Sequence, residues 1–241
     1  MFVRAHDGTA IAYLELGVGR PLVFVHGFTG SASQLVDEGP ARALAAAGFR
    51  VVLPDLRGHG DSDAPRDPSA WPPDVLADDG LELVEALGLD DYELVGYSLG
   101  GRVVLRMLAR GARPRRAVIA GQGRASAAAE GPNSASFRSL LSGIVRGEPL
   151  DPSAQWIVDQ RCGAVALLHL LDTYVASPDA VLAAIPVPTL VLTGDQDRAR
   201  LTAPDLAAAL GDGRFRTVPG DHLAAMVAPE LAEVIIEFLT G

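Results

Sequence analysis

The fold is decided by residues 92–110, which read YELVGYSLGGRVVLRMLAR. Residues 92–97 form a short, mostly apolar run that predicts a strand, and residues 99–110 predict a helix. Between them lies Gly96-Tyr97-Ser98-Leu99-Gly100, a G-x-S-x-G pattern in the strand–turn–helix setting that it requires. Small residues on both sides let the chain bend tightly, so the serine hydroxyl stands clear of the sheet edge. The dipole of the following helix favours negative charge that develops there.

Strands and helices alternate along most of the remaining chain. The sequence starts with two β-prone runs, 2–6 and 10–16, joined by the hairpin signal Asp7-Gly8. Further strands are predicted at 22–26, 49–54, 115–120, 187–193 and 215–218, and further helices at 41–47, 74–87, 203–210 and 223–239. Such alternation indicates βαβ units and a mostly parallel, twisted sheet with an antiparallel N-terminal hairpin.

Residues 122–186 do not follow the alternation. They contain helical patches at 137–145 and 156–174 but no clear buried strand. We interpret them as a helical cap inserted over the carboxyl edge of the sheet, with 1–121 and 187–241 as the core. A run of ordinary crossover helices is the alternative. The apolar residues of this segment either line a pocket or form the cap's own core: Phe137, Leu140, Leu141, Ile144, Trp156, Leu167, Leu168 and Leu171.

Composition limits the class of protein. With 241 residues, 49% of them hydrophobic, the chain suits a single domain with a sizeable core. The formal net charge of −10 disfavours nucleic acid and anionic membranes as partners. A single cysteine excludes an intrachain disulfide and Cys-based zinc spacing, and no metal or cofactor is expected. No signal-peptide pattern and no apolar run of membrane-spanning length is visible, so we expect a cytoplasmic protein acting on a small-molecule substrate.

The chain resembles the serine-nucleophile branch of the α/β-hydrolase superfamily, in which a serine, an acid and a histidine follow one another in that order. The resemblance rests on four places: His26-Gly27-Phe28, Arg57–Ser62, Gly96–Gly100, and the pair Asp197 and His222. It implies an α/β-hydrolase fold with helices on both faces of the sheet. It also implies that segment 57–62 supports the site from beneath and does not react.

A serine hydroxyl is a poor nucleophile at neutral pH and needs a base to take its proton. Of the five histidines, His222 follows the last predicted strand and precedes the closing helix, where it resembles the family's base. A carboxylate must hold that base in the right tautomer. Asp195 and Asp197 both lie in the acidic turn after a predicted strand. The family pattern G-x-x-D, starting at Gly194, selects Asp197 and leaves Asp195 to cap the turn. The catalytic residues are therefore predicted to be Ser98, His222 and Asp197.

The negative charge of a tetrahedral intermediate needs backbone N–H donors. The resemblance implies two of them, the amides of Phe28 and of Leu99, the residue directly after the nucleophile. His26 is expected to brace the loop through hydrogen bonds and not to react.

These residues together predict acyl transfer to water. The expected reaction is hydrolysis of a carboxylic ester, thioester or lactone of a small to medium apolar substrate through an acyl-enzyme. Epoxide hydrolases and dehalogenases of this fold use an aspartate nucleophile, whereas position 98 is serine.

Two alternatives stay open. Local similarity to the menaquinone-pathway lyase of this superfamily implies an elimination, or a C–C bond hydrolysis, on a carboxylate-bearing substrate. Arg102 follows the nucleophile turn as in that lyase, and Arg124 and Arg138 are possible partners for carboxylates. Trp156 is a further candidate for substrate contact. The second alternative is a non-catalytic small-molecule binder of the same fold.

Overall fold

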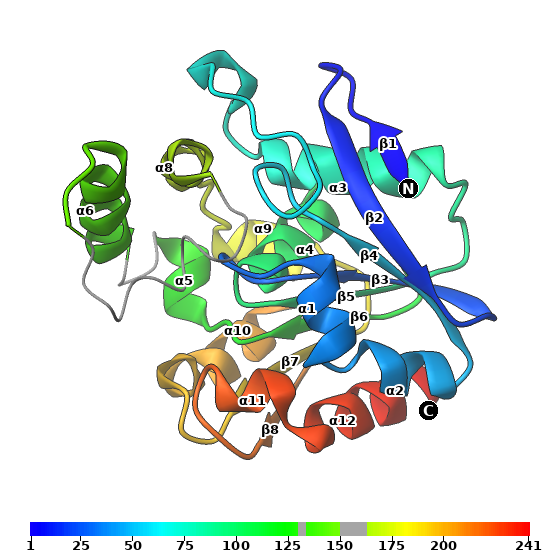
Figure 1. Ribbon diagram of the computed structural model, residues 1–241. Helices are drawn as coiled ribbons and strands as arrows, with labels where there is room; N and C mark the ends of the chain where they lie inside the picture. The colour runs from blue at the N-terminus through cyan, green and yellow to red at the C-terminus, as the bar shows by residue number, and fades with distance from the viewer. Residues whose placement is uncertain (130–133, 150–162) are drawn as a thin grey trace.

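A central β-sheet organises the molecule (Figure 1). The computed structural model describes residues 1–129, 134–149 and 163–241, and among these the sheet has eight strands in the order β1-β2-β4-β3-β5-β6-β7-β8. The strands are β1 (Phe2–Arg4), β2 (Ala10–Leu16), β3 (Arg20–Val25), β4 (Phe49–Pro54), β5 (Glu93–Tyr97), β6 (Ala117–Ala120), β7 (Thr189–Gly194) and β8 (Gly213–Val218). The pairs β1–β2 and β2–β4 are antiparallel, and all the other pairs are parallel. The predicted N-terminal hairpin and mostly parallel sheet are therefore confirmed.

Helices cover both faces of the sheet because its strands are apolar on both sides. On β3, Val23 and Val25 belong to one hydrophobic cluster, and Leu22 and Phe24 to another, as the period of two along a strand requires. The first cluster includes residues of α3 (Val75–Ala86), α4 (Leu99–Ala109) and α10 (Ala203–Ala209). The second includes residues of α1 (Ala32–Asp37), α2 (Ala41–Ala46), α11 (Ala224–Val227) and α12 (Pro229–Thr240).

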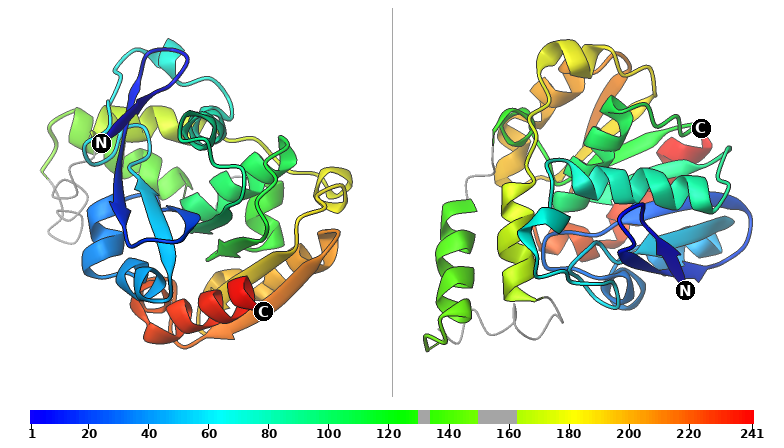
Figure 2. Two further views of the ribbon diagram at one scale, coloured as in Figure 1. Left: turned by 90° about the vertical axis from the view of Figure 1, so that its right-hand side faces the viewer. Right: turned by 90° about the horizontal axis from the view of Figure 1, so that it is seen from above.

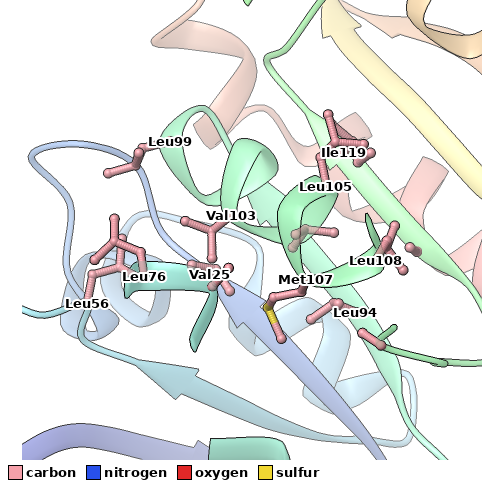
Figure 3. Packing of buried hydrophobic residues seen from close by; sticks show 14 of the residues in the cluster. Val25, Leu56, Leu76, Leu94, Leu99, Val103, Leu105, Met107, Leu108 and Ile119 are labelled. Atoms are coloured by element: carbon pink, nitrogen blue, oxygen red, sulfur yellow. The ribbon is translucent and has the colours of Figure 1, made fainter. Parts of the chain in front are cut away.

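Helix α4 is the best-anchored element of the first face. Figure 3 shows Val103 lying against Val25 of β3, and Met107 beside Leu94 of β5. Helix α3 crosses α4 closely at Gly80, where an added Cβ would lie 2.6 Å from the sulfur of Met107. Because α4 is fixed on two sides, its N-terminal end is held at the carboxyl edge of the sheet.

Residues 122–186 contribute helices only, among those that the structure describes: α5 (Arg124–Ala128), α6 (Ser134–Val145), α8 (Ala164–Asp172) and α9 (Asp179–Ala183). Helices α6 and α8 lie side by side, and α6 lies on the side of the molecule away from both termini (Figure 2). Leu141 and Leu167 are fully buried in the first hydrophobic cluster, so these two form packed core. The ring of Phe137 packs against Phe28, which brings α6 over the loop after β3. The interpretation of residues 122–186 as an inserted cap, and its limits, stay a prediction.

Three local features differ from the sequence-based expectations. No helix is predicted at 32–37, where the structure has α1; Ser31 caps it by accepting a hydrogen bond from the amide of Gln34, at the spacing of a capping box. The single closing helix predicted at 223–239 is two helices, because Pro229 lacks an N–H and holds Ala228 in an extended conformation. Short 3₁₀ turns, η1 (Pro68–Ala70) and η3 (Arg198–Leu201), lie in two stretches for which no helix is predicted. The predicted patch 156–174 begins as α8 at 164, and its residues 156–162 lie outside the described residues.

Over the described parts of the chain, the structure has no helix long and apolar enough to cross a membrane.

Candidate active site

The turn that carries Ser98 is strained as the sequence pattern predicts. Ser98 has φ 54° and ψ −117°, in the left-handed region that side chains with a Cβ avoid. An added Cβ on Gly96 would collide with the backbone oxygen of Gly100, and one on Gly100 with that of Val25. Only glycine fits at both places, so the chain passes directly from β5 into α4 with the hydroxyl at the tip.

Ser98, His222 and Asp197 form one chain of hydrogen bonds. The Nε2 atom of His222 lies 2.9 Å from Ser98 Oγ, and its Nδ1 atom lies 2.7 Å from Oδ2 of Asp197. The other carboxylate oxygen of Asp197 accepts from the amide of Ala199 at 2.9 Å. Since a carboxylate only accepts, Nδ1 of His222 carries the proton and Nε2 is left to receive the proton of Ser98.

Burial and hydrogen bonding act in opposite directions on Asp197, whose side chain is only 4% exposed. Burial by itself raises the pKa of this carboxyl, but the hydrogen bonds from His222 and the Ala199 amide outweigh it and lower that pKa below its ordinary value. Asp197 is therefore charged at neutral pH. The side chain of His222 is 40% exposed, so one edge of the imidazole faces the outside. The base is thus held by a buried anion while remaining accessible to a substrate.

The neighbouring acids have other partners. Asp195 accepts a hydrogen bond from the amide of Gly220 at 3.0 Å and so ties the loop after β7 to the loop after β8. Asp221 accepts from the amides of Leu223 and Ala224, at 3.0 Å and 2.9 Å. Both aspartates organise turns, and Asp197 is the one that contacts the imidazole.

The loop after β3 lies against the nucleophile. An added Cβ on Gly27 would lie 3.5 Å from the Cβ of Ser98, which places the 27–28 peptide at the site. The amide of Leu99 is the first of α4 and has no acceptor inside the helix. The two predicted N–H donors, Phe28 and Leu99, therefore come from the two segments that meet at Ser98.

Two buried histidines brace this loop. His26 donates from Nδ1 to the carbonyl of Gly27 at 2.8 Å and accepts from the amide of Leu56 at Nε2, at 2.9 Å. Burial lowers the pKa of His26 to about 3, so its ring is neutral and its tautomer is fixed by these two bonds. His59 donates from Nε2 to the carbonyl of Phe28 at 2.6 Å. The carbonyls on both sides of the Phe28 amide are thus fixed.

Comparison with known proteins supports the fold that the sequence predicts. A family model for the alpha/beta hydrolase fold matches residues 20–122. The AB hydrolase superfamily protein YisY of Bacillus subtilis (strain 168) is 31% identical over 109 residues, which are 45% of this chain and 39% of YisY. A non-heme haloperoxidase of Rhodococcus erythropolis is 40% identical over 126 residues, which are 50% of this chain and 43% of that protein. The chain thus aligns with less than half the length of these curated relatives.

A solved structure matches the whole chain. The esterase EaEST from Exiguobacterium antarcticum aligns with a TM-score of 0.82, covering 100% of this chain and 99% of its own, at 20% identity. The chain has the α/β-hydrolase fold, and residues 20–122 match the model of that family. At this identity, the likeness to the esterase concerns the fold alone.

The predicted substrate-contact residues that the structure describes have partners within the protein. The guanidinium of Arg102 lies 5.1 Å from the ring centroid of Tyr174. Arg124 forms an ion pair with Asp179, and Arg138 forms one with Asp172 at 2.9 Å. None of these partners belongs to the Ser98–His222–Asp197 chain. Trp156 lies outside the described residues.

Three residues at the site were not predicted. The Tyr97 hydroxyl donates to the backbone carbonyl of His222 at 2.7 Å, and Gln122 donates from Nε2 to the carbonyl of Ser98 at 2.6 Å. An added Cβ on Gly121 would lie 3.1 Å from Cε1 of His222. A signal for Gly121 and Gln122 exists in the sequence, because they directly follow the strand at 117–120. The carboxyl ends of neighbouring parallel strands meet at one edge of a sheet.

Proposed function

We propose that this protein of the α/β-hydrolase fold is a serine hydrolase that cleaves a carboxylic ester, thioester or lactone through an acyl-enzyme. Its substrate would be small to medium in size and apolar. The observation that carries the proposal is the unbroken chain from Ser98 Oγ through His222 to Asp197, with distances of 2.9 Å and 2.7 Å. That chain can remove a proton from a hydroxyl at neutral pH and stabilise the resulting imidazolium.

Acylation would begin when Ser98 Oγ attacks the substrate carbonyl carbon. His222 Nε2 takes the hydroxyl proton as the new C–O bond forms, and the carbonyl electron pair moves onto oxygen. The amides of Phe28 and Leu99 would donate to this oxyanion. The intermediate collapses as the alcohol or thiol leaves with the proton from His222, and the acyl group stays on Ser98.

Deacylation would repeat these steps with water. His222 takes a proton from a water molecule, whose oxygen attacks the acyl carbon. The second intermediate releases the carboxylic acid, and the proton returns to Ser98 Oγ. The imidazolium that forms twice in each cycle faces Asp197, which stays ionised because its pKa is lowered.

Hydrolysis of an apolar ester is favoured over the lyase or C–C hydrolase alternative. That alternative needs cationic side chains at the site to hold a substrate carboxylate. Arg124 and Arg138 are each paired with an aspartate, and Arg102 stacks over a tyrosine. These contacts occupy part of each side chain, although Nη1 of Arg124 is buried without a hydrogen-bond partner among the described residues.

The test is hydrolysis of p-nitrophenyl esters from acetate to decanoate by the wild-type chain and the Ser98→Ala variant. Ser98→Ala should lower kcat/KM by at least about ten-thousandfold, because the nucleophile is lost. Ser69→Ala, at an exposed serine in η1, is the matched control and should keep wild-type activity. The acyl chain length that gives the highest kcat/KM then indicates the size of the acyl pocket.

The outcomes separate the candidate functions. A burst of one equivalent of p-nitrophenol followed by turnover supports an acyl-enzyme, and a burst without turnover supports the non-catalytic binder. If the wild type stays at the Ser98→Ala background on every ester, the esterase proposal fails and carboxylate-bearing lyase and C–C hydrolase substrates are tested instead.

A further inference from the structure

Tyr97 connects the nucleophile strand to the loop that carries the base. It is the last residue of β5, directly before Ser98, and is 4% exposed. Its hydroxyl donates to the carbonyl oxygen of His222 at 2.7 Å. Its ring also contacts the imidazole, with centroids 5.6 Å apart and planes at 52°. One side chain thus contacts both the backbone and the ring of the residue 125 positions away.

Other hydrogen bonds hold the loop on both sides of His222. Its first part is tied to the loop after β7, since Gly220 donates to Asp195 and accepts from the amide of Gln196. Its last part is tied to α11 through the carbonyl of Asp221, which accepts from Ala225 at 3.0 Å. His222 lies between these anchors with a side chain that is 40% exposed, so little protein packs on its outer edge.

Gly121 and Tyr97 together shape the inner side of this position. An added Cβ on Gly121 would lie 3.1 Å from Cε1 of His222 and 3.3 Å from Cε1 of Tyr97. Gly121 has φ 67°, which glycine adopts without strain. The imidazole therefore rests against the end of β6 on one side and the tyrosine ring on the other.

We propose that Tyr97 is a positioning residue for the base: its hydroxyl fixes the backbone of His222 so that Nε2 stays within hydrogen-bond distance of Ser98 Oγ. This rests on the proposed serine hydrolase function. Because Tyr97 and Ser98 are adjacent in the chain, the nucleophile and the brace of its base move as one unit. A misplacement of a catalytic group by an ångström is enough to slow a reaction severely.

The same strand supplies a matched control. Tyr92 directly precedes β5 and is also 4% exposed, so Tyr92→Phe and Tyr97→Phe each remove one buried phenolic hydroxyl from opposite ends of the strand. Phenylalanine keeps the ring and its packing, so both variants should fold. Both should show similar melting temperatures, and only Tyr97→Phe should alter the reaction.

Two kinetic measurements on the full chain test the proposal. In ester hydrolysis, Tyr97→Phe should lower kcat by about 5- to 30-fold and leave KM within about twofold, because Tyr97 orients the base and does not bind substrate. The second measurement is the rate of covalent labelling by an alkyl fluorophosphonate, in which Ser98 Oγ forms a bond to phosphorus and expels fluoride as His222 takes the proton. This rate should fall by a similar factor, with no substrate turnover involved.

A spectroscopic measurement complements the kinetics. The proton shared by His222 Nδ1 and Asp197 should give a low-field proton resonance in the wild type and in Tyr92→Phe. In Tyr97→Phe it should broaden or shift upfield, because a less fixed loop exposes that proton to exchange with water. A role in stability alone would leave this resonance unchanged.

The outcomes distinguish this inference from the function on which it rests. Wild-type kcat, labelling rate and resonance in Tyr97→Phe would overturn the positioning role, and so would an equal loss in Tyr92→Phe. If the wild type is neither labelled at Ser98 nor active on esters, the serine hydrolase proposal itself has failed. If labelling depends on Ser98 but not on Tyr97, the serine hydrolase proposal is supported and only the positioning role of Tyr97 is overturned.

Discussion

Asp197 and Asp79 are both buried and both hydrogen-bond to a nitrogen-containing side chain, but their roles differ. Asp197 is 6% exposed and holds the imidazole of His222, whose other nitrogen reaches Ser98. Asp79 is 4% exposed and holds the guanidinium of Arg57 through two bonds, of 2.9 Å and 2.7 Å. In the Asp197–His222 pair, Nε2 of the imidazole remains available to Ser98. In the Asp79–Arg57 pair, the guanidinium donors are used on groups of the protein.

Arg57 links three segments that are distant in the sequence. Besides Asp79 of α3, its side chain contacts Asp7 in the β1–β2 turn and donates to the carbonyl of Ala70 at 2.7 Å. Its side chain has no exposed surface. Burial by itself lowers the pKa of Arg57, but the bonds to Asp79 and Asp7 outweigh it and raise that pKa. The guanidinium is permanently charged and makes four hydrogen bonds to the protein, as suits a structural contact.

The difference between the two clusters lies in exposure and in the number of partners. An arginine surrounded by acceptors cannot give up its proton or rotate toward a substrate. A histidine with one fixed and one available nitrogen can transfer a proton without disturbing the fold. Mutation of Asp197 should therefore lower activity, and mutation of Asp79 should lower stability.

Of the variants that compare the two aspartates, the largest effect is expected at Asp197. Asp197→Asn presents an amide to His222 Nδ1 and lets the imidazole adopt the tautomer whose Nε2 carries the proton and cannot accept one from Ser98. Within the proposed function, kcat/KM should fall by about a thousandfold or more, roughly 4 kcal/mol in the barrier. Melting temperature should change by only a few degrees.

Asp195→Asn is the control for this variant, since Asp195 lies in the same turn and its oxygen can still accept from Gly220 after the change. It should stay within about twofold of wild type in the ester assay. A loss as large as that of Asp197→Asn would show that the turn, and not the carboxylate on the imidazole, limits the reaction.

The next effect concerns stability and is expected at Asp79. Asp79→Ala leaves the buried guanidinium of Arg57 with Asp7 and one carbonyl, which should lower the free energy of unfolding by roughly 3 kcal/mol. Urea denaturation measures it, and activity per folded molecule should be preserved. Unchanged stability, or a loss of activity in the folded fraction, would contradict the division between the two clusters.

The smallest effect is a pH dependence at Asp7. Burial raises the pKa of Asp7, but its hydrogen bonds to Arg57 and the Thr9 amide outweigh this and lower that pKa to about 2. A group with a depressed folded pKa contributes stability above its unfolded pKa, near 3.8, and loses it as the pH falls through about 2. The contribution, reduced by solvent screening, is about 1 to 2 kcal/mol.

Urea midpoints between pH 7 and pH 2 measure this contribution. Asp7→Asn should be less stable than wild type at neutral pH, and the two should converge below pH 2. The exposed Asp37→Asn supplies the control and should run parallel to wild type throughout. If Asp7→Asn also runs parallel to wild type, Asp7 does not anchor Arg57 in solution.

Much of the site follows from local sequence patterns. The hairpin at Asp7-Gly8, the turn at Ser98 and the acidic turn at 195–197 each depend on residues adjacent in the chain. Their geometry is imposed by short-range steric limits on the backbone, which glycine and hairpin-turn residues reveal directly. The alternation of buried strands with helices then places the carboxyl ends of β5, β7 and β8 at one edge.

The features that the sequence analysis did not predict are of two kinds. Some have a signal between near neighbours in the chain, and one depends on a contact between distant segments. Helix α1 was signalled by Ser31 and Gln34 at capping-box spacing, and the break before α12 by Pro229, so both were readable in the sequence. The bond from Tyr97 to His222 was not, since any buried tyrosine needs some acceptor and the sequence does not name it.

The sequence by itself determined the order of strands and helices along the chain and the strained serine turn. Its resemblance to a known family then singled out the serine, acid and histidine that meet. Only the tertiary structure decided which backbone carbonyl the Tyr97 hydroxyl meets, that Arg102 lies over Tyr174, and that Arg124 pairs with Asp179. The physical reason is range: backbone sterics and side-chain periodicity act between near neighbours, whereas these contacts depend on how β5, β6, β7 and β8 pair and how the loops after them pack.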